Sequence, residues 1–248
     1  MFKIYRTAFQ FTASNPKIFI VWAMFIFAMG AFIELTDASI GISTIAWILI
    51  SFNLHRGLMF GETNLKSKTE QPKRPLWIVR YILVAGSLPM VCLVLAAGIG
   101  LYFVQAIEPD AFVVLMLIVM FFSLIILLSI FGTMLPAIAA ADQFGFGITF
   151  KRAKSTWYKI LGGLFIGPML FSALYYAGIF WLATSVVPIE PYYTKATGLQ
   201  LEQVLIGIVA SCFQLFGFTL SVVVLTLAYR NVASEFVKAE MEESLLQQ

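Results

Sequence analysis

Charge is scarce in this sequence. Only 12% of its 248 residues are Asp, Glu, Lys or Arg, against about 25% in an average soluble domain. Hydrophobic residues make up 60% of the chain, and the mean hydropathy is +0.92. Several apolar runs reach the roughly 18 residues that an α-helix needs to cross a bilayer. The composition therefore excludes an ordinary soluble domain and indicates an all-α polytopic membrane protein.

Side chains that perform chemistry are also few. There is one histidine, His55, and the two cysteines, Cys92 and Cys212, lie inside apolar runs, where they behave as small hydrophobic residues. The chain has no H-E-x-x-H, no G-x-S-x-G, no phosphate-binding glycine loop and no paired carboxylates within an apolar run. We therefore expect no catalytic residue, no metal site, no cofactor and no nucleic-acid partner, which predicts a protein that is not an enzyme.

Six apolar runs predict six transmembrane helices in a single integral membrane domain that covers residues 1–248. Their expected bounds are about 18–35, 40–58, 77–105, 111–140, 158–187 and 204–228. A cleaved signal peptide is the alternative for the first run, because small residues at 28–30 loosely resemble a cleavage site. The run continues past them, which favours a span.

The basic residues divide unevenly between the two sides of this arrangement. If the N-terminus, the 59–76 loop, the central stretch and the C-terminus share one side, fifteen of the sixteen Lys and Arg residues lie on or beside it. Only Lys195 lies opposite. Since cytoplasmic loops collect Lys and Arg, we expect both termini in the cytoplasm and a location in the cytoplasmic (inner) membrane.

Two basic, aromatic segments precede spans and predict amphipathic elbow helices at about 2–15 and 146–157. In the second, apolar residues recur at steps of three or four at positions 146, 150, 153, 157, 160 and 164. Such a helix lies in the plane of a membrane surface. We expect Lys151, Arg152, Lys154 and Lys159 to contact lipid headgroups and Trp157 to enter the membrane. A solvated loop is the alternative.

One amide stands in the middle of the last predicted span. Gln214 must find a hydrogen-bond partner there, and we expect it to join two helices rather than to contact a substrate. Pro89, Pro136 and Pro168 also interrupt apolar runs. They fit ordinary kinks and the broken helices of a transport site equally well.

The central stretch resembles a known family. The residues that carry the resemblance are LPAI at 135–138, ADQFG at 141–145, FKRA at 150–153 and WYKILG at 157–162, with LAYR at 227–230 and the segment 9–19 fitting more loosely. They resemble the membrane domain of bacterial glycerophosphodiester phosphodiesterases and related six-span proteins. Gln143 departs from the acidic or small residue that this family often has. The resemblance implies a non-catalytic membrane module, because the hydrolase of the fused relatives is a separate soluble domain.

Taken together, these features favour a non-enzymatic protein of the cytoplasmic membrane. We expect a scaffold or a module that binds anionic lipid headgroups or other membrane proteins. The alternative is a transporter or lipid-handling protein that works through the kinked third, fourth and fifth spans.

The division of basic residues makes a testable prediction about topology. Reporter fusions placed after Gln248 and within 188–199 are expected to report opposite sides of the membrane, the first cytoplasmic. Paired alkaline phosphatase and green fluorescent protein fusions measure this. The same answer from both positions contradicts the prediction.

Overall fold

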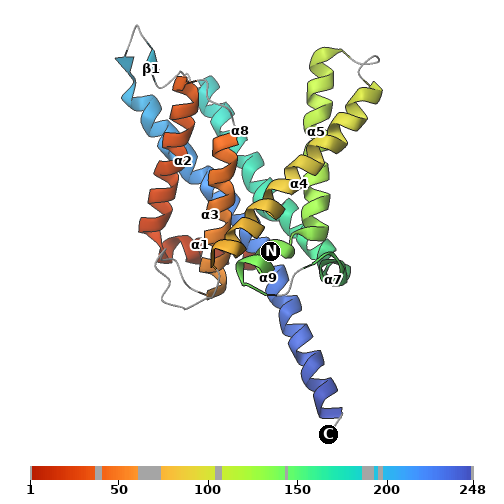
Figure 1. The fold of residues 1–248 in the computed structure, drawn as a ribbon. Helices are drawn as coiled ribbons and strands as arrows, with labels where there is room; N and C mark the ends of the chain where they lie inside the picture. Colours follow the sequence, from red (N-terminus) through yellow and green to blue (C-terminus); the bar gives the residue numbers. More distant parts are fainter. Residues whose placement is uncertain are drawn as a thin grey trace. The chain divides into compact units, whose positions relative to one another are not determined.

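The computed structural model describes residues 2–36, 41–60, 74–103, 108–142, 145–185, 193–194 and 198–246. These ranges are helical except for two short strands (Figure 1). The helices are α1 (Phe2–Ser14), α2 (Pro16–Thr36), α3 (Gly41–Phe60), α4 (Arg74–Phe103), α5 (Pro109–Phe131), α6 (Met134–Ala139), α7 (Phe146–Leu164), the π-helix η1 (Phe165–Met169), α8 (Leu170–Ser185) and α9 (Leu201–Leu246). Strands β1 (Tyr193–Thr194) and β2 (Gly198–Leu199) pair antiparallel. The all-α prediction is confirmed.

The chain divides into two compact units. The first comprises Met1–Leu54 and Gly163–Val224, and the second comprises His55–Gly162 and Leu225–Gln248. Helices α3, α7 and α9 each contribute residues to both units. The two units are therefore described one at a time.

Among the described residues, five helical segments are long and apolar enough to cross a membrane, which is typical of a multi-pass membrane protein. They are Pro16–Ile33, Leu76–Leu101, Ala111–Phe131, Phe146–Ser185 and Leu201–Ala233. The second predicted span corresponds to α3, which is not among these five segments. Six spans thus remain a prediction.

Two helix bounds differ from the predicted ones. The fourth apolar helix, α5, ends at Phe131 instead of near residue 140, and the separate helix α6 follows it. Pro136 has no N–H to donate to the carbonyl of Gly132, so the α-helical ladder breaks there. The predicted elbow does not end at 157, because α7 continues to Leu164 and passes directly into η1 and α8.

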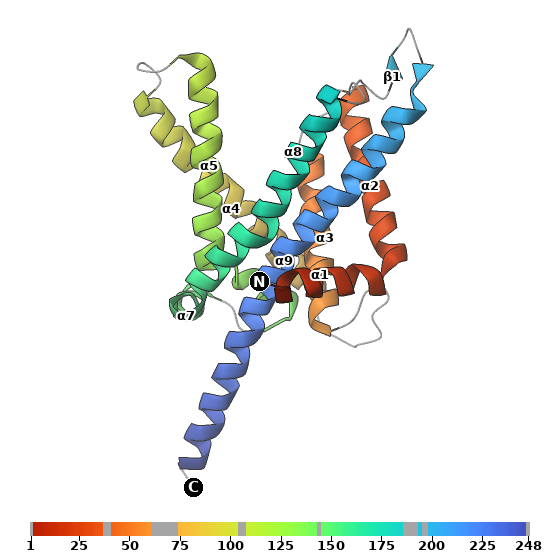
Figure 2. The same ribbon diagram turned by 180° about the vertical axis from the view of Figure 1, so that it is seen from behind.

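In the first unit, α1 lies crosswise to α2 (Figure 2). The hydroxyl of Tyr5 on α1 donates to the carbonyl oxygens of Ile166 at 2.7 Å and Gly167 at 3.1 Å. Both acceptors belong to η1, whose wide turn surrounds Pro168. The single hydroxyl proton of Tyr5 is shared between these two carbonyl oxygens. This contact attaches α1 to the π-helix.

The glycines around η1 permit a close approach of α9. A Cβ atom at Gly163 would meet Cγ1 of Val224 at 2.8 Å, and one at Gly167 would meet Cγ2 of the same valine at 3.7 Å. The small-xxx-small spacing thus allows close helix packing, as such spacing does in membrane helices.

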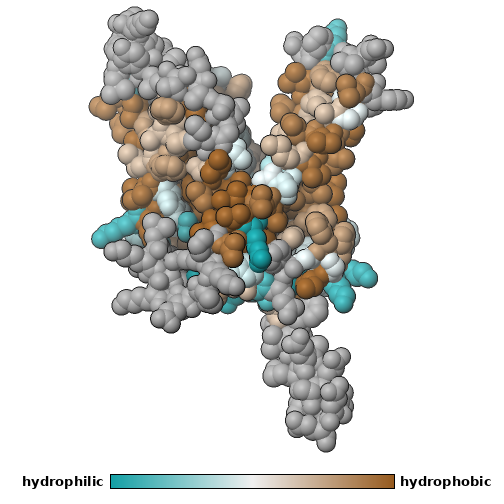
Figure 3. Space-filling view, viewed as in Figure 1, coloured by the Kyte–Doolittle hydropathy of each residue, from teal (hydrophilic) through white to brown (hydrophobic). Residues whose placement is uncertain are grey.

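In the second unit, α4 packs along α5 and contacts α6. All six residues of α6 are buried. Gly132 precedes this helix, and a Cβ atom there would meet Cδ2 of Leu225 on α9 at 2.5 Å. The surface over α5 is largely brown, hence apolar, in Figure 3.

The Tyr5 hydrogen bonds predict a pH-dependent stability. Tyr5→Phe is expected to lower the free energy of unfolding in detergent by about 1 kcal/mol near neutral pH. Burial raises the pKa of Tyr5 above its ordinary value of 10.0, so the native state keeps a proton that the unfolded chain loses. The contribution is thus complete below pH 10 and is lost as the pH rises through the raised pKa.

Chemical unfolding at about pH 8 and about pH 11 checks this. Tyr176→Phe is the matched control, because the Tyr176 side chain is exposed. Equal pH dependence of the wild-type protein and the Tyr5→Phe variant would contradict the assignment.

Candidate functional site

An unusual helix end presents the first residue of the candidate site. After α6, the N–H of Ala141 donates to the carbonyl of Ile138 and that of Asp142 to the carbonyl of Ala137, both at 3.0 Å. This pair of bonds is the Schellman motif, in which the residue after the cap takes a left-handed conformation. Glycine usually stands there, but here Ala141 has φ of 58°, at a cost of about 1–2 kcal/mol. The left-handed turn at Ala141 directs Asp142 back toward α7 and α9.

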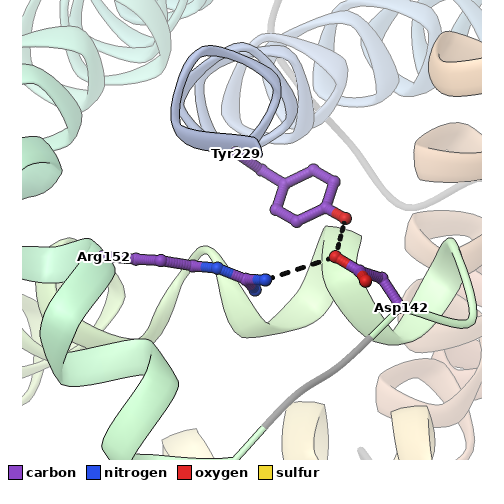
Figure 4. Close-up of polar contacts among 3 residues, drawn as sticks. All are labelled: Asp142, Arg152 and Tyr229. Carbon is purple, nitrogen blue, oxygen red and sulfur yellow. Dashed lines mark hydrogen bonds and ion pairs between the residues drawn. The ribbon is translucent and has the colours of Figure 1, made fainter. Parts of the chain in front are cut away.

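The Asp142 carboxylate accepts hydrogen bonds from two helices (Figure 4). Nη2 of Arg152 on α7 lies 3.2 Å from Oδ2 of Asp142, and the Tyr229 hydroxyl on α9 donates to the same oxygen. The Arg152 guanidinium also lies over the Tyr229 ring, with Cζ 5.2 Å from the ring centroid, as in a cation–π contact. We call these three residues the Asp142 cluster.

The two side chains of the ion pair differ in how far they are buried. The Arg152 side chain is 7% exposed, whereas that of Asp142 is 39% exposed. Within the described residues, Nε and Nη1 of Arg152 have no hydrogen-bond partner. A buried guanidinium without a counter-charge is costly, so Asp142 is the group that permits Arg152 to be buried. Water at the exposed side of Asp142 weakens the pair, since exposed ion pairs contribute little.

Other polar contacts connect the end of α3 to the same unit. Nδ1 of His55 lies 2.7 Å from Oγ1 of Thr226 on α9, with the tautomer deciding which atom donates. Nη1 of Arg56 donates to the carbonyl oxygen of Ala139 on α6 at 3.2 Å. The only histidine in the sequence is thus a fully buried residue that holds α9.

Helix α7 has a buried face and an exposed aromatic face. Its buried face is formed by Thr149, Arg152, Ala153, Thr156 and Ile160, which recur at steps of three or four. Phe150 and Trp157 lie on a neighbouring face and are 51% and 48% exposed. The buried face thus carries hydroxyl groups and Arg152, whereas the aromatic residues predicted to enter the membrane face outward.

The predicted headgroup residues separate into two groups. Lys151, Lys154 and Lys159 are exposed, and Nζ of Lys159 lies 5.7 Å from the centroid of the Tyr158 ring. Arg152 differs, because it is buried in the Asp142 cluster. Headgroup contact is therefore no longer expected of Arg152, since its charge already has a partner inside the protein.

A groove of about 580 Å³ lies between α5 and α7. Lys154, Phe150 and Trp157 line it from α7, and Ile126 and Ser129 line it from α5. The Ser129 hydroxyl donates to the carbonyl of Ile125 at 2.7 Å, so it is satisfied within its own helix. The groove is therefore apolar along its length and carries one lysine.

Gln214 lies in the first unit, on α9, away from the residues of the Asp142 cluster in the sequence. It lines two cavities, of about 410 Å³ and about 290 Å³. Its amide has no hydrogen-bond partner among the described residues. The predicted contact between two helices is thus not made by this side chain within the described part of the chain.

The Asp142 cluster is suited to holding helices in position. Within the described ranges, no group of three or more His, Cys, Asp or Glu side chains is placed to hold a metal ion. Asp142 is engaged by Arg152 and Tyr229, and the cluster joins the end of α6 to α7 and α9. The groove and the exposed lysines are parts of this unit that are open to a ligand.

Comparison with known protein families, with curated proteins and with solved structures finds no match for this chain.

A double-mutant cycle tests the Asp142 cluster. Tyr229→Phe is expected to lower the free energy of unfolding by about 1.5–3 kcal/mol, because the lost hydrogen bond goes to a charged group. In an Asp142→Asn background the same change is expected to cost only about 0.5–1.5 kcal/mol, as for a neutral bond. Tyr158→Phe, at an exposed ring on α7, is the control. Additive costs would show that the two residues do not interact.

Proposed function

We propose that this protein is a non-enzymatic, multi-pass protein of the bacterial cytoplasmic membrane that binds anionic lipid through α7. In this proposal the groove between α5 and α7 holds an acyl chain, and Lys154 pairs with the phosphate of the headgroup. The observation that carries the proposal is the presence of Lys154, Trp157 and Phe150 along one apolar groove. The protein then acts as a scaffold or partner-binding module whose elbow is fixed at the membrane surface.

The faces of α7 support a location in the membrane interface. Aromatic residues are exposed on one face, and exposed lysines lie beside them. A basic residue near an anionic surface is worth about 1 kcal/mol, and burying an aromatic side chain is worth about 1.5–3 kcal/mol. Lys151, Lys154 and Lys159 with Phe150 and Trp157 would thus hold the helix flat without any contribution from Arg152.

The topology belongs to the same proposal. Six spans place both termini in the cytoplasm, with α3 as the second span and α1 as the other elbow. The division of basic residues, fifteen against one, supports this orientation. The resemblance of 135–162 to the membrane domain of glycerophosphodiester phosphodiesterases supports a role without catalysis.

Transport or lipid handling is the second candidate function. Two cavities support it because each lies beside a proline within an apolar helix. One, of about 460 Å³, lies at Pro89 on α4, and the other lies at Pro168 in η1. Broken helices near binding cavities are typical of transporters.

Quenching of Trp157 by brominated lipid tests the lipid site. A variant that keeps Trp157 and carries Phe at positions 22, 47, 77 and 181 is reconstituted in phosphatidylcholine bilayers. Small fractions of phosphatidylglycerol or phosphatidylcholine with brominated acyl chains are then added. We expect the quenching to show that phosphatidylglycerol binds about fivefold more tightly than phosphatidylcholine. This ratio corresponds to about 1 kcal/mol of binding free energy from one lysine.

Lysine variants separate a site from general surface attraction. Lys154→Gln is expected to abolish the preference for phosphatidylglycerol, whereas Lys151→Gln, which does not line the groove, retains it. Added salt weakens the preference in the wild type. Equal quenching by the two lipids, or an equal effect of the two lysine variants, would overturn the proposal.

A further inference from the structure

Two cavities of the first unit share lining residues. The larger, of about 410 Å³, lies among α3, η1, α8 and α9, and the smaller, of about 290 Å³, lies among α2, α3 and α9. Trp47 on α3 and Gln214 on α9 line both. These two side chains therefore stand where the cavities adjoin.

Aromatic rings form one wall of the larger cavity. The rings of Phe171 and Phe213 are stacked, with centroids 6.2 Å apart and planes 22° apart, and those of Tyr175 and Phe213 are 5.7 Å and 20° apart. Gly217 lies against this wall, since a Cβ atom there would meet Cδ1 of Phe171 at 3.2 Å. These rings stack on one another, and the parts of them that line the cavity offer a flat ligand an offset-stacking surface.

The polar residues that line the two cavities are uncharged. Among the residues that the structure describes, no Asp, Glu, Lys, Arg or His lines either cavity. Gln214 offers an amide without a partner among the described residues, in a helical segment apolar enough to span a membrane. The Gln214 side chain is exposed at the rim of the cavities, and in a membrane an amide that faces lipid without a partner costs several kcal/mol, so a ligand that bonds to it would recover part of this cost.

We propose that these cavities bind a flat, uncharged ring that carries a carbonyl oxygen, the chemistry of a quinone. The ring stacks beside Phe171, Phe213 and Tyr175, and the Gln214 amide donates to the carbonyl. A charged headgroup is excluded because burying it without a counter-charge is too costly. The rim includes Pro168 of η1, and π-helical turns occur frequently at functional sites. This site is independent of the lipid groove.

Fluorine NMR on the full chain in bilayer discs tests the proposal. The five tryptophans are replaced by 5-fluorotryptophan, and the Trp47 resonance is assigned from its loss in Trp47→Phe. The probe is 2-methyl-1,4-naphthoquinone, and the matched compound is 2-methylnaphthalene, which has the same ring shape without oxygens. We expect the quinone to shift the Trp47 resonance saturably, with about tenfold tighter binding than the hydrocarbon.

Substitution of the amide then isolates its contribution. Gln214→Leu is expected to weaken quinone binding about tenfold and to leave 2-methylnaphthalene binding unchanged. Gln10→Leu makes the same chemical change at an exposed site on α1 and should alter neither. The resonances of Trp77 and Trp157, in the second unit, should not follow the Trp47 titration. Equal affinity for the two compounds, or a uniform unsaturable shift of all five resonances, would overturn the proposal.

Discussion

The second unit depends on one carboxylate. Asp142 accepts from Arg152 on α7 and from Tyr229 on α9, and its own position follows from the left-handed turn at Ala141. Without that carboxylate, α7 would bury a guanidinium on a face otherwise made of Thr149, Thr156 and small or aliphatic residues. The ion pair thus determines which face of α7 turns inward, and thereby which residues remain outside to form the groove with α5.

The architecture was largely predictable from the sequence, because runs of apolar residues as long as a bilayer is thick are a strong signal. The break between α5 and α6 was harder to predict. Residues 132–140 remain mostly apolar, and Pro136 is the residue that indicates a break in the hydrogen-bond ladder. Helix α3 is the reverse case. Its last turns carry His55 and Arg56, which lower the hydropathy of the segment although contacts with other helices bury both side chains.

The candidate site was predictable only in part. Periodicity identified α7 and its aromatic and basic residues. It could not show that Arg152 is buried while Lys151 and Lys154 are exposed, because all three are basic residues of the same stretch. The signal that was available is Asp142, the one acid in a basic stretch. Tyr229 lies 87 residues from Asp142 in the sequence, and no local pattern links such a pair. In the first unit, Gln214 was noticed as a polar residue at membrane depth, whereas the ring wall beside it arises from packing between α8 and α9.

The π-helix has a consequence for the geometry of α8. Each i→i+5 turn holds one residue more than an α-helical turn, so every side chain after η1 is rotated by about 100° relative to an uninterrupted α-helix. Phe171 and Tyr175 face Phe213 with that offset included. The number of residues between Leu164 and Leu170 therefore sets the angular phase of α8. Loss of a single residue there would turn the ring wall away from α9 while leaving the composition of the helix almost unchanged. In this part of the chain, segment length carries structural information that residue identity does not.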